Sequence, residues 1–372
     1  MQIYRLKGRE LNDFINDPAF KNIKHLPISR HRAVSHISNP RKGDDDIILY
    51  IAQEGDQLIA YRTVYADYLY IGKNTIKAGW LSGNWVIPGK RRQGIASKLL
   101  QAALNDWDNS IIFTNYAPES KAVYDKSGQF ELVKSKNGIR GYMRFYLHYL
   151  LPPKSAFFKK IKGLLKFLDL VLNIFADSRI LILRAFRKTR QVQLEFLYHI
   201  DKESEVFIRE WKQKELTRRN GDEMNYILQY PWVINAFMRD DVNSKYHFSA
   251  LASPFFCIYL KIYDNNSQMI GFLMLTIKSK ELKIPYLYYN VENESLIGGV
   301  ITELMIRKKL NMCTIYHEAM AAYLRTHRTP FLWKKNIQQN YYATRPVADV
   351  FFKSAGKDQI IFQDGDGDPA FV

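Results

Sequence analysis

The spacing of hydrophobic residues alternates between two patterns over the first 150 residues. Short apolar runs rich in β-branched and aromatic residues predict strands, whereas apolar residues three or four positions apart predict helices. Residues 31–46 are polar and predict a loop. The predicted strands are 1–6, 47–52, 57–65, 80–87, 110–115, 129–133 and 140–148, and the predicted helices are 10–24 (interrupted at Pro18), 95–107 and 120–126.

The same order of elements returns in the second half of the chain, after a helix predicted at 204–219. It begins with a hairpin (255–263 with 269–277) and a strand (282–290). A helix (295–309), a strand (312–316), a helix (317–326) and a strand (331–343) follow. We therefore predict an α/β (α+β) protein of two domains, in which each domain is a mixed, mostly antiparallel sheet flanked by helices.

A basic segment separates the two halves after Pro152 and Pro153. Residues 154–190 contain ten Lys or Arg residues, opposed only by Asp169 and Asp177. Apolar residues recur in it at helical spacing: Phe157, Ile161, Leu164, Leu165, Leu168, Leu172 and Phe175. Such a helix either packs its apolar face on a domain or lies on an anionic membrane. The predicted organisation is thus a domain at 1–150, a basic amphipathic helical linker at 151–191 and a second domain at 192–372.

Composition narrows the possible partners. The chain has 372 residues, of which 47% are hydrophobic, so it can bury sizeable cores. Its 54 Lys and Arg exceed its 37 Asp and Glu, giving a net charge of +17, which favours an anionic partner. The basic residues follow no nucleic-acid-binding motif, so nucleic acid is not expected. Two isolated cysteines, Cys257 and Cys313, predict free thiols in a reducing cytoplasm, and we expect neither a signal peptide nor a spanning helix.

Candidate chemistry begins at the turn between the strand at 80–87 and the helix at 95–107. Pro88 ends the strand, and a basic turn containing Gly94 leads into the helix. Free backbone N–H groups in front of a helix N-terminus bind phosphate. Gly94 and Ala96 allow close approach, while Arg91 and Arg92 add positive charge. An ordinary strand-to-helix turn with solvated arginines is the alternative.

Later residues favour the first interpretation. Arg91-x-x-Gly94-x-Ala96, followed by Asn115, Tyr124 and Gly128-x-Phe130, resembles the GNAT superfamily of acyl-CoA-dependent N-acyltransferases over roughly residues 45–145. The resemblance implies that acetyl-CoA binds to the turn through its pyrophosphate and to the preceding strand through its pantetheine arm. The implied CoA-binding residues are Trp85, Val86 and Ile87 on the strand, Arg91, Arg92, Gln93, Gly94, Ile95 and Ala96 in the turn, and Asn115.

The resemblance also implies a catalytic role for Tyr124, as the acid that protonates the departing CoA thiolate. A packing tyrosine is the alternative. Many members of the superfamily carry a Glu on the strand before the turn as a base, but residues 81–85 offer no carboxylate. Ser82 and Asn84 could orient the amine or its water there, and the Val86 N–H could support the oxyanion.

The second half lacks the phosphate-binding pattern. Its corresponding turn, residues 290–299, carries Glu292 and Glu294, which would repel phosphate, so we predict a degenerate GNAT-like domain. Near the end of the chain, Asp364, Asp366 and Asp368 alternate with glycine; a docked turn and a metal loop both fit, and no metal is predicted.

The predicted function is acyl transfer from acyl-CoA to a primary amine, such as an amino sugar of a glycan precursor. A catalytically inactive scaffold that binds a glycan, a membrane surface or a protein partner is the alternative.

Overall fold

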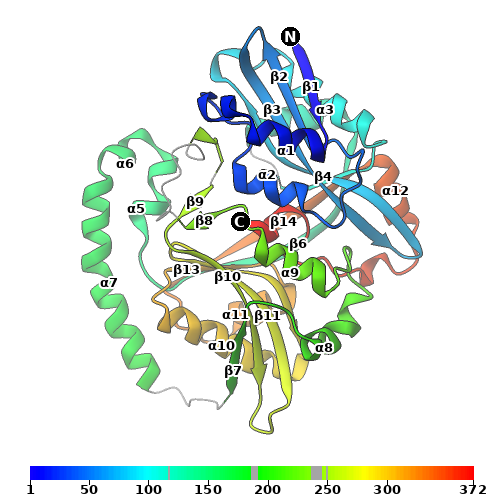
Figure 1. Ribbon diagram of the computed structural model, residues 1–372. Helices are drawn as coiled ribbons and strands as arrows, with labels where there is room; N and C mark the ends of the chain where they lie inside the picture. The colour runs from blue at the N-terminus through cyan, green and yellow to red at the C-terminus, as the bar shows by residue number, and fades with distance from the viewer. Residues whose placement is uncertain (116–117, 186–191, 236–244, 249) are drawn as a thin grey trace. The chain divides into compact units, whose positions relative to one another are not determined.

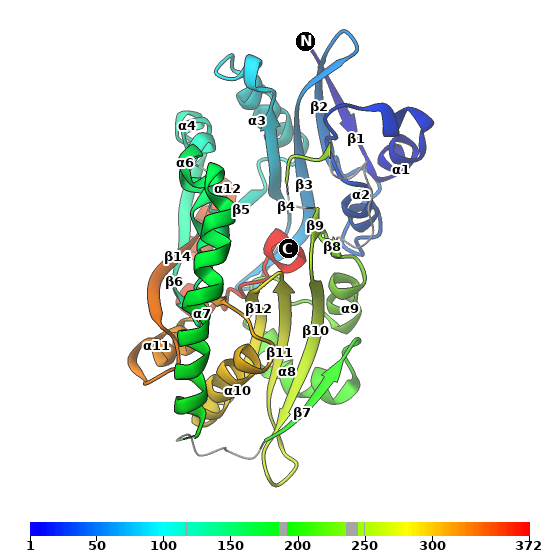
Figure 2. The same ribbon diagram turned by 90° about the vertical axis from the view of Figure 1, so that its left-hand side faces the viewer.

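The computed structural model describes residues 1–115, 118–185, 192–235, 245–248 and 250–372 (Figures 1 and 2). The chain forms two compact units, and neither is continuous in sequence. Unit 1 comprises residues 1–135, 197–259 and 339–372, and unit 2 comprises residues 136–196 and 260–338. The predicted boundaries at residues 150 and 191 therefore do not separate the units.

The sheet of unit 1 has the strand order β1-β2-β3-β4-β5-β14. Neighbours from β1 to β4 are antiparallel, β4 and β5 are parallel, and β14 closes the order antiparallel to β5. The strands are β1 (Gln2–Leu6), β2 (Leu49–Glu54), β3 (Gln57–Ile71), β4 (Asn74–Val86), β5 (Ile111–Thr114) and β14 (Trp333–Thr344). The strand beside β5 thus comes from the last part of the chain, which the prediction of contiguous domains did not foresee.

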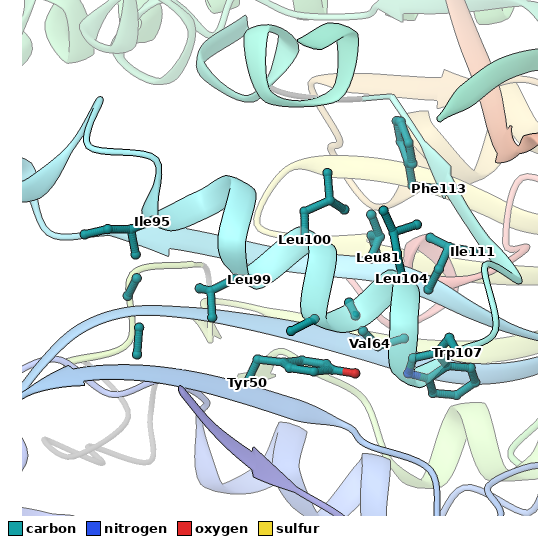
Figure 3. Close-up of a cluster of buried hydrophobic side chains, with 14 of the residues drawn as sticks. Tyr50, Val64, Leu81, Ile95, Leu99, Leu100, Leu104, Trp107, Ile111 and Phe113 are labelled. Atoms are coloured by element: carbon teal, nitrogen blue, oxygen red, sulfur yellow. The ribbon is translucent and has the colours of Figure 1, made fainter. Parts of the chain in front are cut away.

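Helices cover both faces of this sheet. Residues of α1 and α2 pack with one set of strand residues, including Tyr61 and Trp85. The apolar side of α3 packs with the other set, as the labelled side chains in Figure 3 show. The helices of the unit are α1 (Gly8–Asn16), α2 (Arg30–Ile37), α3 (Ile95–Asp106), α4 (Pro118–Ser127), α8 (Lys202–Lys212), α9 (Gly221–Gln229) and α12 (Arg345–Lys353), with short strands β8 (Ile234–Asn235) and β9 (Leu251–Ala252).

Helix α2 corrects the loop predicted at residues 31–46. Three polar residues of this helix, Arg32, Ser35 and His36, are almost completely buried. The helix therefore turns a polar side inward, and no apolar period marks it in the sequence. This correction matters because Arg32 becomes part of the candidate site.

A buried ionic cluster joins distant segments of unit 1. Asp67 on β3 is fully buried and accepts hydrogen bonds from Arg41 (2.7 Å), Arg219 (2.6 Å) and the Trp80 indole (3.1 Å). Arg41 also donates twice to Glu223, at 2.6 Å each. Burial opposes ionisation of Glu223, but the Arg41 hydrogen bonds keep the pKa of this carboxyl below its ordinary value. The cluster fixes the loop at Arg41 and the start of α9 to the sheet.

Unit 2 has the strand order β6-β13-β12-β11-β10-β7. As in unit 1, an antiparallel pair (β11 with β12) is followed by a helix and a parallel pair (β12 with β13), and β6 closes the order antiparallel to β13. The elements are β6 (Phe130–Tyr142), β7 (Gln193–Leu197), β10 (Phe255–Tyr263), β11 (Met269–Lys278), β12 (Glu281–Tyr289), α10 (Glu294–Arg307), β13 (Met312–Ile315) and α11 (Glu318–Thr326). That this half is a degenerate GNAT-like domain stays a prediction.

The basic segment forms α5 (Leu147–Leu150), α6 (Ala156–Lys160) and the long helix α7 (Lys162–Ala185). The described part of the segment is helical, as predicted, but its role as a linker between domains stays a prediction. Phe186, Arg187, Lys188 and Arg190 lie outside the described residues. Among the described helices, none combines the length and hydrophobicity needed to cross a bilayer. Cys257 and Cys313, both within the described residues, form no disulfide, and burial raises the pKa of the Cys313 thiol to about 12.

Candidate active site

The turn between β4 and α3 presents backbone donors to solvent. Gly94 is the residue before the helix and has φ 77°, and Arg92 also has a positive φ of 64°. Lys98 donates its N–H to the Gly94 carbonyl (3.0 Å), which begins the backbone bonding of the helix. The amides of the first helical turn have no intrahelical acceptor. A Cβ added to Gly94 would meet nothing within 4 Å, so the space in front of these donors is open. This geometry suits an anion.

Beside this turn, β4 separates from β5. The parallel register pairs Gly79 with Ile111 and Trp80 with Ile112, and no described pairing continues towards Val86. Ile87 donates its N–H to Ile59 of β3 (2.8 Å). Because successive residues of a strand direct their N–H groups to opposite edges, the Val86 N–H points away from β3 and towards the gap. The gap therefore offers main-chain partners to an extended ligand.

A β-bulge lies at the centre of this region. The register of β3 and β4 pairs Arg62 with Asn84 and Thr63 with Ser82, which leaves Gly83 (φ 75°) as the extra residue. The Asn84 side-chain oxygen is buried and has no hydrogen-bond partner in the described part of the chain. A bulge re-aims neighbouring groups, and an unsatisfied buried acceptor indicates space for a ligand donor.

Tyr124 of α4 is placed by aromatic packing and by a buried arginine. Its ring stacks on Phe113 with centroids 4.5 Å apart, and its hydroxyl accepts a hydrogen bond from Arg62 Nη1 (3.2 Å). Arg62 is 1% exposed, and its Nε and Nη2 find no partner among the described residues. A buried guanidinium with unused donors is costly without an anion or polar ligand nearby. Tyr124 thus faces a cationic group that can stabilise a phenolate.

A second polar cluster involves the α2 side of the sheet. The buried Arg32 donates to Ser82 Oγ (2.6 Å), Thr63 Oγ1 (3.0 Å) and the Tyr246 hydroxyl (2.9 Å). Ser82 in turn donates to Asp368 Oδ2 (2.8 Å). Burial raises the pKa of the Tyr246 hydroxyl, and the nearby Asp368 adds to that rise against the opposing effect of Arg32. The tail of the chain therefore brings a carboxylate to β4, where the sequence offers none.

A basic cavity of about 470 Å³ opens on the same side. Its basic lining residues are Lys24, His25, Arg91, Lys245 and His247, its aromatic ones are Tyr61, Trp85 and Tyr246, and none of its described lining residues is Asp or Glu. Burial lowers the pKa of His247, and the charges of Arg91 and His25 lower it further. The described lining of the cavity is therefore basic and aromatic.

Most of the predicted site residues lie around the turn between β4 and α3. Val86 and Ile87 are at the end of β4, and Gly94 is in the turn itself. Arg91 bends back, and its Nε donates to the Val86 carbonyl (3.2 Å), while Gln93 Nε2 donates to Gly89 (3.4 Å). Arg92 is exposed, whereas Ile95 is buried and Ala96 is half-buried.

Asn115 and Trp85 make contacts away from the turn, and their predicted roles in CoA binding stay predictions. Asn115 follows β5, and its N–H and its side-chain oxygen are both bonded to the Asn340 backbone, at 2.9 and 3.0 Å. Trp85 lies on the α2 side, where it stacks on Tyr61 and lines the basic cavity.

Sequence reasoning did not assign Arg32 or Arg62 to the site, and it read Asp368 as part of a docked turn or a metal loop rather than as a neighbour of β4. Arg62 left a signal, because it is an arginine inside an otherwise apolar strand. The carboxylates near the end of the chain accept protein hydrogen bonds: Asp366 accepts from Thr217 (2.7 Å), and Asp368 accepts from Ser82. Within the described residues, no group of three or more His, Cys, Asp or Glu is placed to hold a metal ion.

Residues 30–133 match the family model described as acetyltransferase (GNAT) domain. A conserved protein of unknown function from Enterococcus faecalis V583, described as a probable N-acyltransferase, shares the fold at 9% identity, with a TM-score of 0.51 over 95% of this chain and 74% of that one. GCN5-related N-acetyltransferases from Anabaena variabilis ATCC 29413 and Kribbella flavida match at 10% and 11% identity and TM-scores of 0.47 and 0.43, covering 92% of this chain and 71% and 70% of theirs. Curated proteins give no match.

Proposed function

We propose that the protein transfers an acyl group, in the simplest case acetyl, from acyl-CoA to a primary amine. The observation that carries this proposal is the open turn at Gly94 beside the gap between β4 and β5. The turn suits the CoA pyrophosphate, and the adjoining edge of β4 suits the amide groups of the pantetheine arm. A thioester at the end of that arm would lie beside the Val86 N–H.

The chemistry needs few groups. The amine nitrogen attacks the thioester carbonyl, the carbon–sulfur bond breaks, and the thiolate takes up a proton. The Val86 N–H supports the oxyanion, and Tyr124 gives its proton to the thiolate. Arg62 then stabilises the phenolate that remains through its hydrogen bond to the Tyr124 oxygen.

Asp368 is our candidate for the base. It accepts a hydrogen bond from Ser82, next to the bulge, and so stands in for the carboxylate that the strand itself lacks. We expect Asp368→Asn to lower kcat by about 100-fold at neutral pH, since a positioned base contributes on the order of 10²–10⁴. The loss should shrink as pH rises, because the amine then loses its proton to solvent. The measurement is thiol release from acetyl-CoA across a pH series.

Asp364→Asn is the matched control and should leave kcat and its pH profile unchanged. An Asp368→Asn variant whose loss is the same at every pH would show a structural role instead. The acetyl-CoA affinity of both variants should be unchanged, which would show that Asp368 acts in the chemical step and not in CoA binding.

The basic cavity supports an acceptor that carries an anionic group beside its amine, such as a phosphorylated amino sugar of a glycan precursor. Calorimetric titration should first show acetyl-CoA binding. Thiol release should then give a kcat/KM at least about tenfold higher for glucosamine 6-phosphate than for glucosamine, the equivalent of roughly 1.4 kcal/mol.

Exchanging Lys24 and Lys245 for Ala should remove that preference, whereas Lys73→Ala, an exposed lysine of the β3–β4 turn, should keep it. Equal rates for both sugars would contradict the anionic acceptor but leave acyl transfer standing. Failure to bind acetyl-CoA would remove the enzymatic proposal and favour a non-catalytic scaffold.

A further inference from the structure

Helix α7 is held in unit 2 by polar groups on its inner side. Asp169 accepts hydrogen bonds from the backbone N–H groups of Leu147 (2.8 Å) and His148 (3.0 Å). One turn later, Asn173 bonds both the N–H and the carbonyl of Phe145, at 2.8 and 3.0 Å. These bonds fix the rotation of the helix about its axis.

Two ionic or polar contacts continue this attachment towards the helix C-terminus. Asp177 accepts from Arg144 at 2.6 Å, and Arg179 donates to the carbonyl of Pro330 at 2.8 Å. Leu165, Ala176 and Ile180 are buried on the same side. The inner side therefore contains most of the polar anchors of the helix.

The opposite side of α7 is apolar and faces solvent. Its large side chains are 38–70% exposed, and most recur at spacings of three, four or seven residues, which places them in one stripe. We call this stripe the outer face: Leu164, Phe167, Leu168, Ile174, Phe175 and Ile182. Phe157 of α6 is likewise 62% exposed. Water-soluble helices normally show the reverse arrangement, so this surface indicates a binding partner.

Exposed lysines lie at the N-terminal end of α7 and on α6 just before it. Lys159 and Lys160 belong to α6, and Lys162 and Lys166 to the first turns of α7. All are exposed, and none forms an ion pair with another described residue. Large exposed apolar side chains on a helix whose N-terminal end carries unpaired lysines match the apolar interior and anionic headgroups of a lipid surface.

A second copy of the chain fits this charge pattern less well. In a parallel pair of α7 helices the lysine clusters would meet each other. In an antiparallel pair they would meet the other end of the helix, which carries Arg179. Both arrangements bring like charges together, which disfavours self-association.

We propose that the outer face of α7 docks on an anionic lipid bilayer with the helix parallel to the membrane plane. The apolar side chains enter the acyl boundary, and the lysines contact the headgroups. The proposal does not depend on acyl transfer, and it fits the finding that no described helix has the character of a membrane span.

The experiment is sedimentation of the full chain with vesicles of phosphatidylcholine alone or with 30% phosphatidylglycerol. We expect at least tenfold stronger partitioning to the anionic vesicles, weakening as salt increases. Changing Phe167, Ile174 and Phe175 to Ser should reduce that partitioning about tenfold or more. Changing Lys159, Lys160 and Lys162 to Glu should do the same.

Two matched controls serve these variants. Val291→Ser removes an apolar side chain that is 80% exposed elsewhere in unit 2, and the Lys308, Lys309 and Lys335 to Glu triple variant makes the same change in charge on other exposed lysines. Both should bind vesicles like the original chain. Thermal unfolding of each variant confirms that it is folded.

Absent partitioning, or partitioning equal in the variants and the original chain, would overturn the proposal. The proposal would also fail if the original chain self-associated without binding vesicles and the Ser variant lost that self-association. Binding that is equally strong on neutral vesicles and insensitive to the Lys-to-Glu changes would also overturn it, since the anionic surface is part of the claim.

Discussion

Replacing Gly94 with Glu should reduce acetyl-CoA affinity at least about 100-fold, the equivalent of roughly 2.7 kcal/mol. The new Cβ projects into the open space in front of the turn, so the Glu side chain places a carboxylate where the pyrophosphate would lie. The two anions repel each other, and the positive φ of Gly94 adds backbone strain of about 1–2 kcal/mol in a residue that has a Cβ. Calorimetric titration with acetyl-CoA measures the effect directly.

Gly356→Glu provides a control of the same kind. Gly356 also has a positive φ (84°), is exposed, and has only Gln359 within 4 Å of an added Cβ. Gly356→Glu therefore introduces the same backbone strain and the same charge at a site away from the turn. Its acetyl-CoA affinity should equal that of the original chain. Gly94→Asn separates the two causes, because Asn tolerates positive φ without adding a charge. Tight binding by Gly94→Glu would disprove the phosphate-binding role of the turn.

Replacing Asp67 with Ala should lower the free energy of unfolding by about 3–5 kcal/mol. The change leaves the guanidiniums of Arg41 and Arg219 buried without their shared carboxylate, and it removes the acceptor of the Trp80 indole. Uncompensated buried charge costs far more than the contact itself is worth. Urea unfolding of the variant and the original chain, followed by tryptophan fluorescence, measures the difference.

The exposed pair Lys7–Asp45 supplies the comparison. Its two atoms are 2.7 Å apart, as close as in the buried cluster, but the Asp45 side chain is 94% exposed. Asp45→Ala should therefore change the free energy of unfolding far less than Asp67→Ala does, because solvent screens the exposed pair. Similar losses for the two variants would show that burial does not set the strength of the Asp67 cluster.

Local features were predictable from the sequence because each depends on neighbouring residues. The turn at Gly94, the helix behind it and the helix that carries Tyr124 are all signalled by glycine, proline and apolar spacing within a few positions. The long helix α7 was predictable on the same grounds. Which of its sides is exposed was not, because its apolar residues surround much of the helix and the anchors of Asp169 and Asn173 are set by folding.

Non-local features were not predictable. The sequence marks residues 331–343 as a strand but does not say which strand it joins, because buried strands of similar pattern are interchangeable as neighbours. The candidate base could not be predicted for the same reason, since it comes from a distant part of the sequence. Asp368 is 286 residues from Ser82, and only the folded chain brings them together. Arg32 was overlooked because its helix buries polar residues and so lacks an apolar period.

The position of β14 beside β5 affects how the protein is made. Unit 1 includes residues 339–372, so its sheet stays incomplete while the ribosome is still translating the preceding part of the message. At about 5–20 residues per second, the nascent β5 would wait on the order of ten seconds or more for its neighbour. During that interval an unpaired strand edge is open to misassembly, which makes this chain a candidate for assistance by chaperones during synthesis.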